Sequence, residues 1–312
     1  MKIAKYLNHL GVDSMLKVAL GQDLTVFRFN DSTGWITRDQ VDFDYVDGNI
    51  ADQDWDAFIF DDIDTVRNYL AQPVRAQKHI WYCHGTFSAW EGAQQYFNKH
   101  FTNISVSVIF TDEYKRTMVD QWRNFPIVHT TVQPIALGNH RYTESQEKNS
   151  RCFTVGNNYN RVCQLYPRYE TLSRPGIIEL MRRYPTQFDA FGWNGLEDGE
   201  IFGEFRRSSV SISTLTPWSA SIHLSGVASI GFALAECFAA AIPVLATPKY
   251  QLPGNGTWVE IQTVEQMIEA VDQLLTNPAR ARDLGRAGQE MFKKHFGIDQ
   301  YGEKLKTWLE TL

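Results

Sequence analysis

The sequence predicts an α/β protein built from two Rossmann-like domains that face a cleft, and three observations support this prediction. Runs of strand length alternate with helical stretches from one end of the chain to the other, which is typical of parallel βαβ units. At 312 residues the chain is long enough for two such domains, because single cores tend to split beyond about 250 residues. A polar segment over 138–150, with almost no apolar residue, separates the two halves.

The first half of the chain contains five apolar or β-branched runs that have the length of buried strands. They cover residues 24–29, 57–60, 79–83, 106–110 and 127–132. The clearest helix covers 114–122 and follows Thr111 and Asp112, two candidate N-caps. The segment 31–56 has no clear periodicity and stays unassigned. We expect an N-terminal Rossmann-like domain over 1–140 and a linker over 141–150.

The second half repeats the alternation and ends in helices. Predicted elements cover 152–156, 175–184, 187–191, 201–207, 210–214, 232–241 and 243–247. Thr263 and Gln266 form a predicted capping box, and Asn277 followed by Pro278 predicts the start of a further helix. We expect a second Rossmann-like domain over 151–296 and a C-terminal helix over 297–312 that packs back on the first domain.

The composition is that of an ordinary globular protein, with 43% hydrophobic and 21% charged residues. No run approaches the roughly 18 apolar residues of a membrane span, and the first residues lack the apolar stretch of a secretory signal. We therefore expect a cytoplasmic protein without a transmembrane segment. The net charge of -6 gives no general attraction to nucleic acid, and four cysteines without a CxxC pair argue against disulfides and zinc.

The most informative stretch is GVASIGFALAECFAAAIPVLATP, residues 226–248. Its small-residue loop ends in Ser229, Ile230 and Gly231, and Phe232 begins a helix of small apolar residues. Small side chains let a ligand approach the backbone, and the free amides and dipole of a helix N-terminus favour phosphate. Glu236, an acid in an otherwise uncharged run, would accept hydrogen bonds from the two hydroxyls of a ribose. The stretch therefore predicts a site for a nucleoside diphosphate.

This stretch resembles the donor-binding signature of the large retaining glycosyltransferase family numbered four, in which an EGFG loop leads into a helix with a second Glu. Gly231 matches the second Gly and Glu236 the second Glu, and the resemblance extends from 152 to the end of the chain. It implies the GT-B architecture and transfer of a sugar from a nucleotide-diphosphate sugar with retention, with no metal and no cofactor required. Ala228 replaces the first Glu, which contacts the transferred sugar in that family.

The resemblance also implies cations for the leaving diphosphate in the loop after the first strand of the second domain. That loop reads VGNNYNRVCQ, with Asn157 at the place of the family's Arg and Arg161 near the place of its Lys. Arg161 is the candidate that neutralises the leaving group, with a solvated loop arginine as the alternative, and Lys249 is a second candidate. Asn194, after the predicted strand 187–191, is a candidate neighbour of the nucleotide base.

Two histidines complete the candidate site. His84 directly follows the predicted strand 79–83, which places it at the edge where open α/β sheets bind ligands. In GT-B enzymes a His in a similar loop faces the donor sugar; a structural His is the alternative. No Asp or Glu lies between Phe205 and Ala235, and His223 is our candidate in that interval to bind a sugar hydroxyl or phosphate. A loop histidine without a role is the alternative for His223.

Other catalytic motifs are missing from the sequence. It contains no GxxxxGK[ST], GxGxxG, HExxH or GxSxG pattern, and no DxD flanked as in metal-dependent transferases. Two hypotheses remain. The first is an active glycosyltransferase that acts on a saccharide or on a modified base in DNA, and the second is a non-catalytic nucleotide-sugar-binding protein that serves as a sensor or scaffold. The sequence does not fix the oligomeric state.

Overall fold

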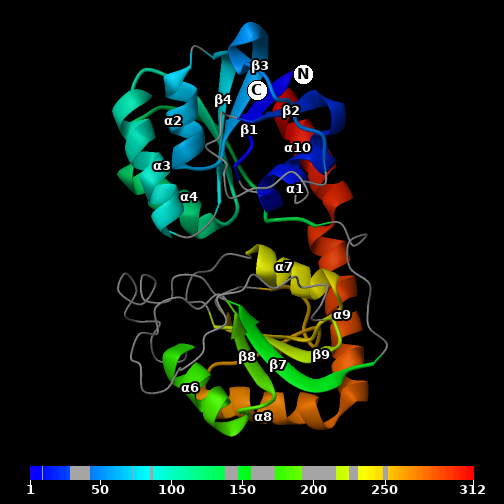
Figure 1. Cartoon of the computed structure of the whole chain (residues 1–312). Helices are drawn as coiled ribbons and strands as arrows, with labels where there is room; N and C mark the ends of the chain where they lie inside the picture. Colours follow the sequence, from blue (N-terminus) through cyan, green and yellow to red (C-terminus); the bar gives the residue numbers. More distant parts are fainter. Residues whose placement is uncertain are drawn as a thin grey trace. The chain divides into compact units, whose positions relative to one another are not determined.

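The computed structural model describes residues 1–8, 10–28, 43–72, 74–84, 87–137, 147–155, 173–191, 216–224, 231–248 and 252–312. The chain divides into two compact units: unit 1 comprises Met1–Ala136 and Ile298–Leu312, and unit 2 comprises Leu137–Gly297. Each unit contains a parallel β-sheet flanked by helices (Figure 1). The predicted α/β class, with two parallel sheets, is confirmed.

The sheet of unit 1 has the strand order β2-β1-β3-β4-β5-β6, and every described pairing in it is parallel. The strands are β1 Ile3–Tyr6, β2 Leu24–Phe27, β3 Asp54–Phe60, β4 Arg75–Cys83, β5 Val106–Phe110 and β6 Ile127–Val132. All residues of β1 and β5 are buried, as expected for a parallel sheet covered on both faces. Because the strands are parallel, their carboxyl ends share one edge of the sheet.

Helices cover both faces of this sheet, with α2, α3 and α4 on one side and α1 and α10 on the other (Figure 1). They are α1 Leu10–Leu20, α2 Ile63–Ala71, α3 Phe87–His100, α4 Glu113–Trp122 and α10 Ile298–Glu310. Short 3-10 turns cover Gly21–Asp23 and Ile50–Asp52. The last helix packs on α1 so closely that a Cβ at Gly302 would lie 3.3 Å from the carbonyl oxygen of Ala19.

Aromatic rings form much of the core between β3, β4 and the helices α2 and α3. The ring centroid of Phe60 lies 5.4 Å from that of Phe97 and 5.5 Å from that of Phe101, both in edge-to-face arrangements. The ring centroid of Trp81 lies 5.0 Å from that of Phe97 in a tilted arrangement, and Trp81 is fully buried. Such pairs add to the stabilisation from burial, so this half of unit 1 is a rigid support for the sheet edge.

The sheet of unit 2 has the strand order β11-β10-β9-β7-β8, again with parallel pairings throughout the part that the structure describes. The strands are β7 Asn149–Val155, β8 Phe188–Phe191, β9 Trp218–His223, β10 Val244–Ala246 and β11 Val259–Glu260. The helices are α6 Ser173–Arg183, α7 Phe232–Ala239, α8 Val264–Thr276 and α9 Pro278–Phe296. The predicted elements over 201–207 and 210–214 lie outside the described residues.

Two caps begin the helices near the end of unit 2. Asn277 caps α9 by accepting a hydrogen bond from the Arg280 amide at 3.0 Å, and Pro278 is the first helical residue. Thr263 accepts from the Gln266 amide at 3.2 Å at the start of α8. The Gln266 side chain accepts from the amide of Gln262 at 2.9 Å, one residue before the N-cap, so the predicted capping box is only half formed.

Helix α9 lies against the turn that connects α7 with β10. A Cβ built at Gly285 would lie 2.1 Å from the carbonyl oxygen of Ala241, and one at Gly288 would lie 2.9 Å from the carbonyl oxygen of Thr257. Ala241 itself has a positive φ of 52°, which is uncommon for a residue other than glycine. The two glycines let backbone pack on backbone and thereby fix the carboxyl end of α7.

Candidate functional site

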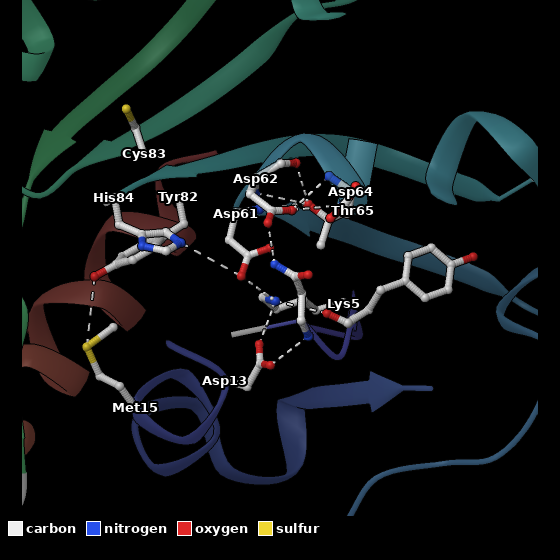
Figure 2. A network of polar contacts seen from close by, with 12 residues as sticks. Lys5, Asp13, Met15, Asp61, Asp62, Asp64, Thr65, Tyr82, Cys83 and His84 are labelled. Atoms are coloured by element: carbon white, nitrogen blue, oxygen red, sulfur yellow. Dashed lines mark hydrogen bonds and ion pairs between the residues drawn. The ribbon is translucent and has the colours of Figure 1, made fainter. Parts of the chain in front are cut away.

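The carboxyl edge of the sheet in unit 1 gathers charged side chains from three strands and one helix. Lys5 lies in β1, Asp61 follows β3, His84 follows β4, and Asp13 comes from α1 (Figure 2). All four are buried, and the most exposed of them, His84, has only 5% of its surface exposed. We refer to Lys5, Asp13, Asp61 and His84 as the edge cluster.

Lys5 is the centre of the edge cluster. Its Nζ lies 2.5 Å from Asp13 Oδ1 and 2.9 Å from Asp61 Oδ2, and it donates a hydrogen bond to the carbonyl oxygen of Tyr6 at 2.9 Å. Asp13 Oδ2 accepts a further hydrogen bond from the amide of Asn8 at 2.9 Å. A buried ammonium group is tolerated because these partners replace its water shell.

His84 approaches the cluster through the same carboxylate oxygen that Lys5 contacts. Its Nε2 lies 3.9 Å from Asp61 Oδ2, a distance at which a protonated ring forms an ion pair. On the other side its ring centroid lies 5.5 Å from that of Tyr82, whose hydroxyl contacts Met15 Sδ at 3.9 Å (Figure 2). The structure therefore places the predicted residue His84 beside a carboxylate that the sequence analysis did not select.

A second carboxylate, Asp62, extends the network toward α2. Its side chain accepts from the amides of Asp64 and Thr65 at 2.9 and 3.1 Å, and the Thr65 hydroxyl completes a capping box. Asn8 Nδ2 donates to Asp62 Oδ2 at 2.6 Å and so ties the end of β3 to the segment that follows β1. These bonds fix the backbone at the point where Asp61 leaves the sheet.

Burial and charge shift the pKa values in this network. Burial disfavours a charged Lys5, but the carboxylates of Asp13 and Asp61 outweigh it, so the pKa of Lys5 is raised and the ammonium stays charged. Burial raises the pKa of Asp13 to about 6, assisted by Asp61 and opposed by Lys5. Burial and Asp61 raise the pKa of Asp62 to about 6 as well. The site therefore binds protons more readily than an exposed group of carboxylates.

In unit 2 the predicted donor helix begins where the sequence places it. Gly231 is the N-cap of α7 and is exposed, and a Cβ added there would meet no atom of the described residues within 4 Å. The first amides of a helix have no partner within the helix, and the dipole favours an anion beside them. Glu236 lies in the same helix and is partly buried. Phe232 is the first helical residue.

His223 ends β9, in register with Ala246 of β10. Its backbone oxygen accepts a hydrogen bond from Thr247 at 3.3 Å, and its side chain is 5% exposed. Among the described residues, Nε2 has no hydrogen-bond partner. Burial lowers the pKa of His223 to about 3, so the imidazole is neutral near pH 7 and one of its polar atoms is ready for a ligand hydroxyl or phosphate.

The structure describes some of the predicted site residues, which divide between the two units, and leaves the others undescribed. His84 lies in unit 1, whereas His223, Gly231, Phe232 and Glu236 lie in unit 2. The others lie outside the described residues: Asn157, Arg161, Asn194, Ala228, Ser229, Ile230 and Lys249.

Lys5, Asp13 and Asp61 were not predicted as site residues from the sequence. One signal could have found Asp61: it directly follows a buried strand, as His84 does.

The described part of the chain contains no group of three or more His, Cys, Asp or Glu side chains arranged to hold a metal ion. Within the same ranges, no helix is both long enough and apolar enough to cross a membrane. Cys83, Cys152 and Cys237 are buried free thiols. Burial raises their pKa values, so they are poor nucleophiles at neutral pH.

Several solved structures share the fold of the whole chain. HepE from Anabaena, in complex with UDP and glucose, matches with a TM-score of 0.68 and 12% identity over 100% of both chains. Sucrose-phosphate synthase from Thermosynechococcus elongatus matches with a TM-score of 0.64 and 12% identity over 100% of this chain and 99% of the other. TarM matches with a TM-score of 0.57 and 13% identity over 81% of this chain, which spans 54% of TarM.

No protein-family model matches the chain, and no curated protein matches it in sequence. At identities of 12–13% the structural matches establish the fold and nothing finer. These neighbours are glycosyltransferases of the GT-B fold. The chain therefore has the GT-B fold, as predicted.

Proposed function

We propose that this protein is a glycosyltransferase that moves a sugar from a nucleotide-diphosphate sugar to an acceptor, with retention and without a metal ion. The observation that carries the proposal is the start of α7 at Gly231, where the first amides have no partner within the helix, together with Glu236 in a helix that resembles the donor helix of family four. The fold supports it, because solved neighbours hold UDP or UDP-glucose. Retention has support from a neighbour, trehalose-6-phosphate synthase, that was studied for retaining transfer.

In this proposal unit 2 binds the donor. The diphosphate lies at the N-terminus of α7, near the amides that follow Ser229, Ile230 and Gly231, and Glu236 accepts hydrogen bonds from the ribose hydroxyls. Arg161 neutralises the leaving group, with Lys249 as the second candidate cation, and Asn157 binds the donor. Asn194 borders the base. These assignments follow from the resemblance to family four.

Each unit contains one histidine of the proposal. His223, buried and neutral, binds a sugar hydroxyl or a phosphate oxygen through Nε2. His84 contributes from unit 1, which is the acceptor-side domain in the predicted division of the chain at 141–150. Positioning and electrostatics then supply most of the rate enhancement, because the leaving diphosphate itself assists the incoming hydroxyl.

A saccharide is the acceptor that we propose, with a modified base in DNA as the other candidate, and we place the reaction in the cytoplasm. One observation favours the second function, a nucleotide-sugar-binding sensor or scaffold. Ala228 stands where family four has the Glu that contacts the transferred sugar, so binding could persist without turnover.

The test is a screen against a panel of nucleotide sugars, read by thermal shift and by release of nucleoside diphosphate. A donor that stabilises the protein and is slowly hydrolysed by wild type but not by Glu236→Ala would establish the transferase. Glu269→Ala, which removes an exposed glutamate from α8, is the matched control and should behave as wild type. Binding without turnover, even with saccharide and DNA acceptors present, would favour the sensor. No binding at all would refute the donor site.

A further inference from the structure

The edge cluster has an arrangement of charges that the proposed function does not use. One oxygen, Asp61 Oδ2, faces both the ammonium of Lys5 at 2.9 Å and Nε2 of His84 at 3.9 Å (Figure 2). The same Lys5 Nζ also lies 2.5 Å from Asp13 Oδ1. Two carboxylates therefore divide one cation, and the imidazole stands beside one of them.

Among the described residues of the edge cluster, one ammonium faces two carboxylates. With all groups ionised, Lys5 contributes one positive charge against the negative charges of Asp13 and Asp61, and Asp62 adds another at its margin. A buried negative charge is costly unless a cation or a proton compensates it. Protonation of His84, the least buried of the four residues, would supply a cation at Asp61 Oδ2.

We propose that Asp61 is a positioning residue for His84: held in place by Lys5, its carboxylate fixes the imidazole ring and favours the protonated form. Protonated His84 then presents hydrogen-bond donors and a positive charge to a bound sugar or phosphate. Only this last role rests on the proposed function; the coupling between Asp61 and His84 does not.

Tyr82, Asp13 and Asp62 belong to the described network around His84 (Figure 2). The Tyr82 ring lies tilted beside that of His84, and burial, with a contribution from the Tyr301 hydroxyl of α10, raises the pKa of the Tyr82 phenol, so Tyr82 stays neutral near pH 7. Asp13 and Asp62 are the alternative proton acceptors, because burial raises both pKa values to about 6. The experiment must therefore follow His84 itself rather than the total proton uptake.

Histidine-ring NMR provides that readout. The protein labelled in its histidine rings is titrated from pH 5 to 9, and the signal that disappears in His84→Gln is assigned to His84. In Asp61→Asn we expect the protonation midpoint of His84 to fall by about one pH unit or more, because an opposite charge nearby has been removed. Asp61→Asn leaves Lys5 paired with Asp13, so the variant retains a partner for the buried ammonium.

Two further variants separate coupling from a general effect of lost charge. In Asp13→Asn, Lys5 pairs with Asp61 alone and neutralises more of its negative charge. The protonation midpoint of His84 should therefore fall, but by a smaller amount than in Asp61→Asn. Asp54→Asn is the matched control, because Asp54 is exposed at the opposite end of β3 and pairs with Arg75 at 2.9 Å. Its effect on His84 should be less than about 0.3 pH unit, since exposed charges are screened with distance.

The pH profile of donor hydrolysis then connects the coupling to activity. We expect the alkaline limb of the wild-type pH dependence, where His84 loses its proton, to move to lower pH in Asp61→Asn. This limb should be absent from His84→Gln and from the double variant alike. A shifted protonation midpoint of His84 without turnover of any donor would support the coupling between Asp61 and His84 and refute the proposed function. An unchanged midpoint in Asp61→Asn and Asp13→Asn would overturn this inference, whatever the activity.

Discussion

Burial of the His223 imidazole has a measurable consequence for the free energy of unfolding. Its pKa is about 3 in the folded protein and about 6.5 in an unfolded chain, so the unfolded state binds more protons between these values. The free energy of unfolding therefore falls as the pH drops below about 6.5. From pH 7 to pH 5 this single group should cost about 2 kcal/mol.

Replacement of His223 by Gln should remove that loss. We expect the unfolding free energy of His223→Gln, measured by urea titration, to depend less on pH than that of wild type. Between pH 7 and pH 5, wild type should lose about 2 kcal/mol more unfolding free energy than the variant. Parallel pH profiles would show that His223 is protonated in the folded state, contrary to this prediction.

Asp62 should show the opposite sign. Its pKa is raised to about 6 in the folded protein, so the folded state binds more protons than the unfolded chain between about pH 4 and 6. Its ionisation therefore destabilises the protein as the pH rises through this window. Asp62→Asn, which keeps an N-cap for α2, should flatten that part of the stability curve. A variant that loses stability faster than wild type between pH 4 and 6 would contradict the assignment.

Individual site residues were predictable where a local pattern marks them. His84 follows a buried strand and Glu236 is the one acid in a helix of small apolar residues, so both stand out from their neighbours. Asp61 also follows a buried strand, but it was not recognised because Asp61, Asp62 and Asp64 together look like a solvated acidic turn. Its pairing with Lys5 joins residues 56 positions apart, and no local pattern encodes that contact.

At the element scale, the start of α7 allows a direct test of anion binding. Gly231 has space for a side chain and a φ of -83°, so Gly231→Ser should fold normally. The serine hydroxyl would accept a hydrogen bond from one of the first helical amides and compete with the donor phosphate. We expect donor affinity to fall about fivefold, the equivalent of one capping hydrogen bond. Gly231→Ala is the control and should keep its affinity; equal weakening in both variants would exclude amide competition.

The contact between α9 and the end of α7 predicts a stability effect. A Cβ at Gly285 would lie 2.1 Å from the Ala241 carbonyl oxygen, and neither backbone can yield without moving a helix. Gly285→Ala should therefore destabilise unit 2 by about 1–3 kcal/mol, as overpacking does, despite the better helix propensity of alanine. Thermal and urea unfolding measure this loss. A neutral or stabilising Gly285→Ala would show that α9 lies farther from this turn.

Strand β1 shows why some elements escaped prediction. Lys5 interrupts its short apolar run, and a lysine in four residues normally indicates an exposed or irregular segment. The side chain is fully buried because Asp13 and Asp61 neutralise it. The strand and the edge cluster were thus missed for the same reason. Two strands of unit 1 without a buried charge, β5 with Val106–Phe110 and β6 with Ile127–Val132, were predicted with their observed bounds.

At the scale of the whole molecule, the α/β class could be predicted because it depends on alternation along the entire chain, which errors in single elements do not erase. The strand orders could not be predicted in the same way. The neighbours β1 and β3 of unit 1, and β7 and β9 of unit 2, are separated by intervening strands or long segments in the sequence. Such pairings depend on packing between distant segments rather than on local composition.

The last helix provides the test at this scale, because α10 follows α9 directly in the sequence but belongs to unit 1. Leu305 is fully buried in α10, and its truncation to Ala should cost about 2–5 kcal/mol. The loss should appear in unit 1, as faster amide hydrogen exchange in α1 and β1, while α8 of unit 2 keeps its protection.

Leu275→Ala, a similar truncation within α8, is the matched control and should have the reverse pattern. If Leu305→Ala instead released α8 and left α1 protected, α10 would be part of unit 2. The chain would then cross between its two units once rather than twice.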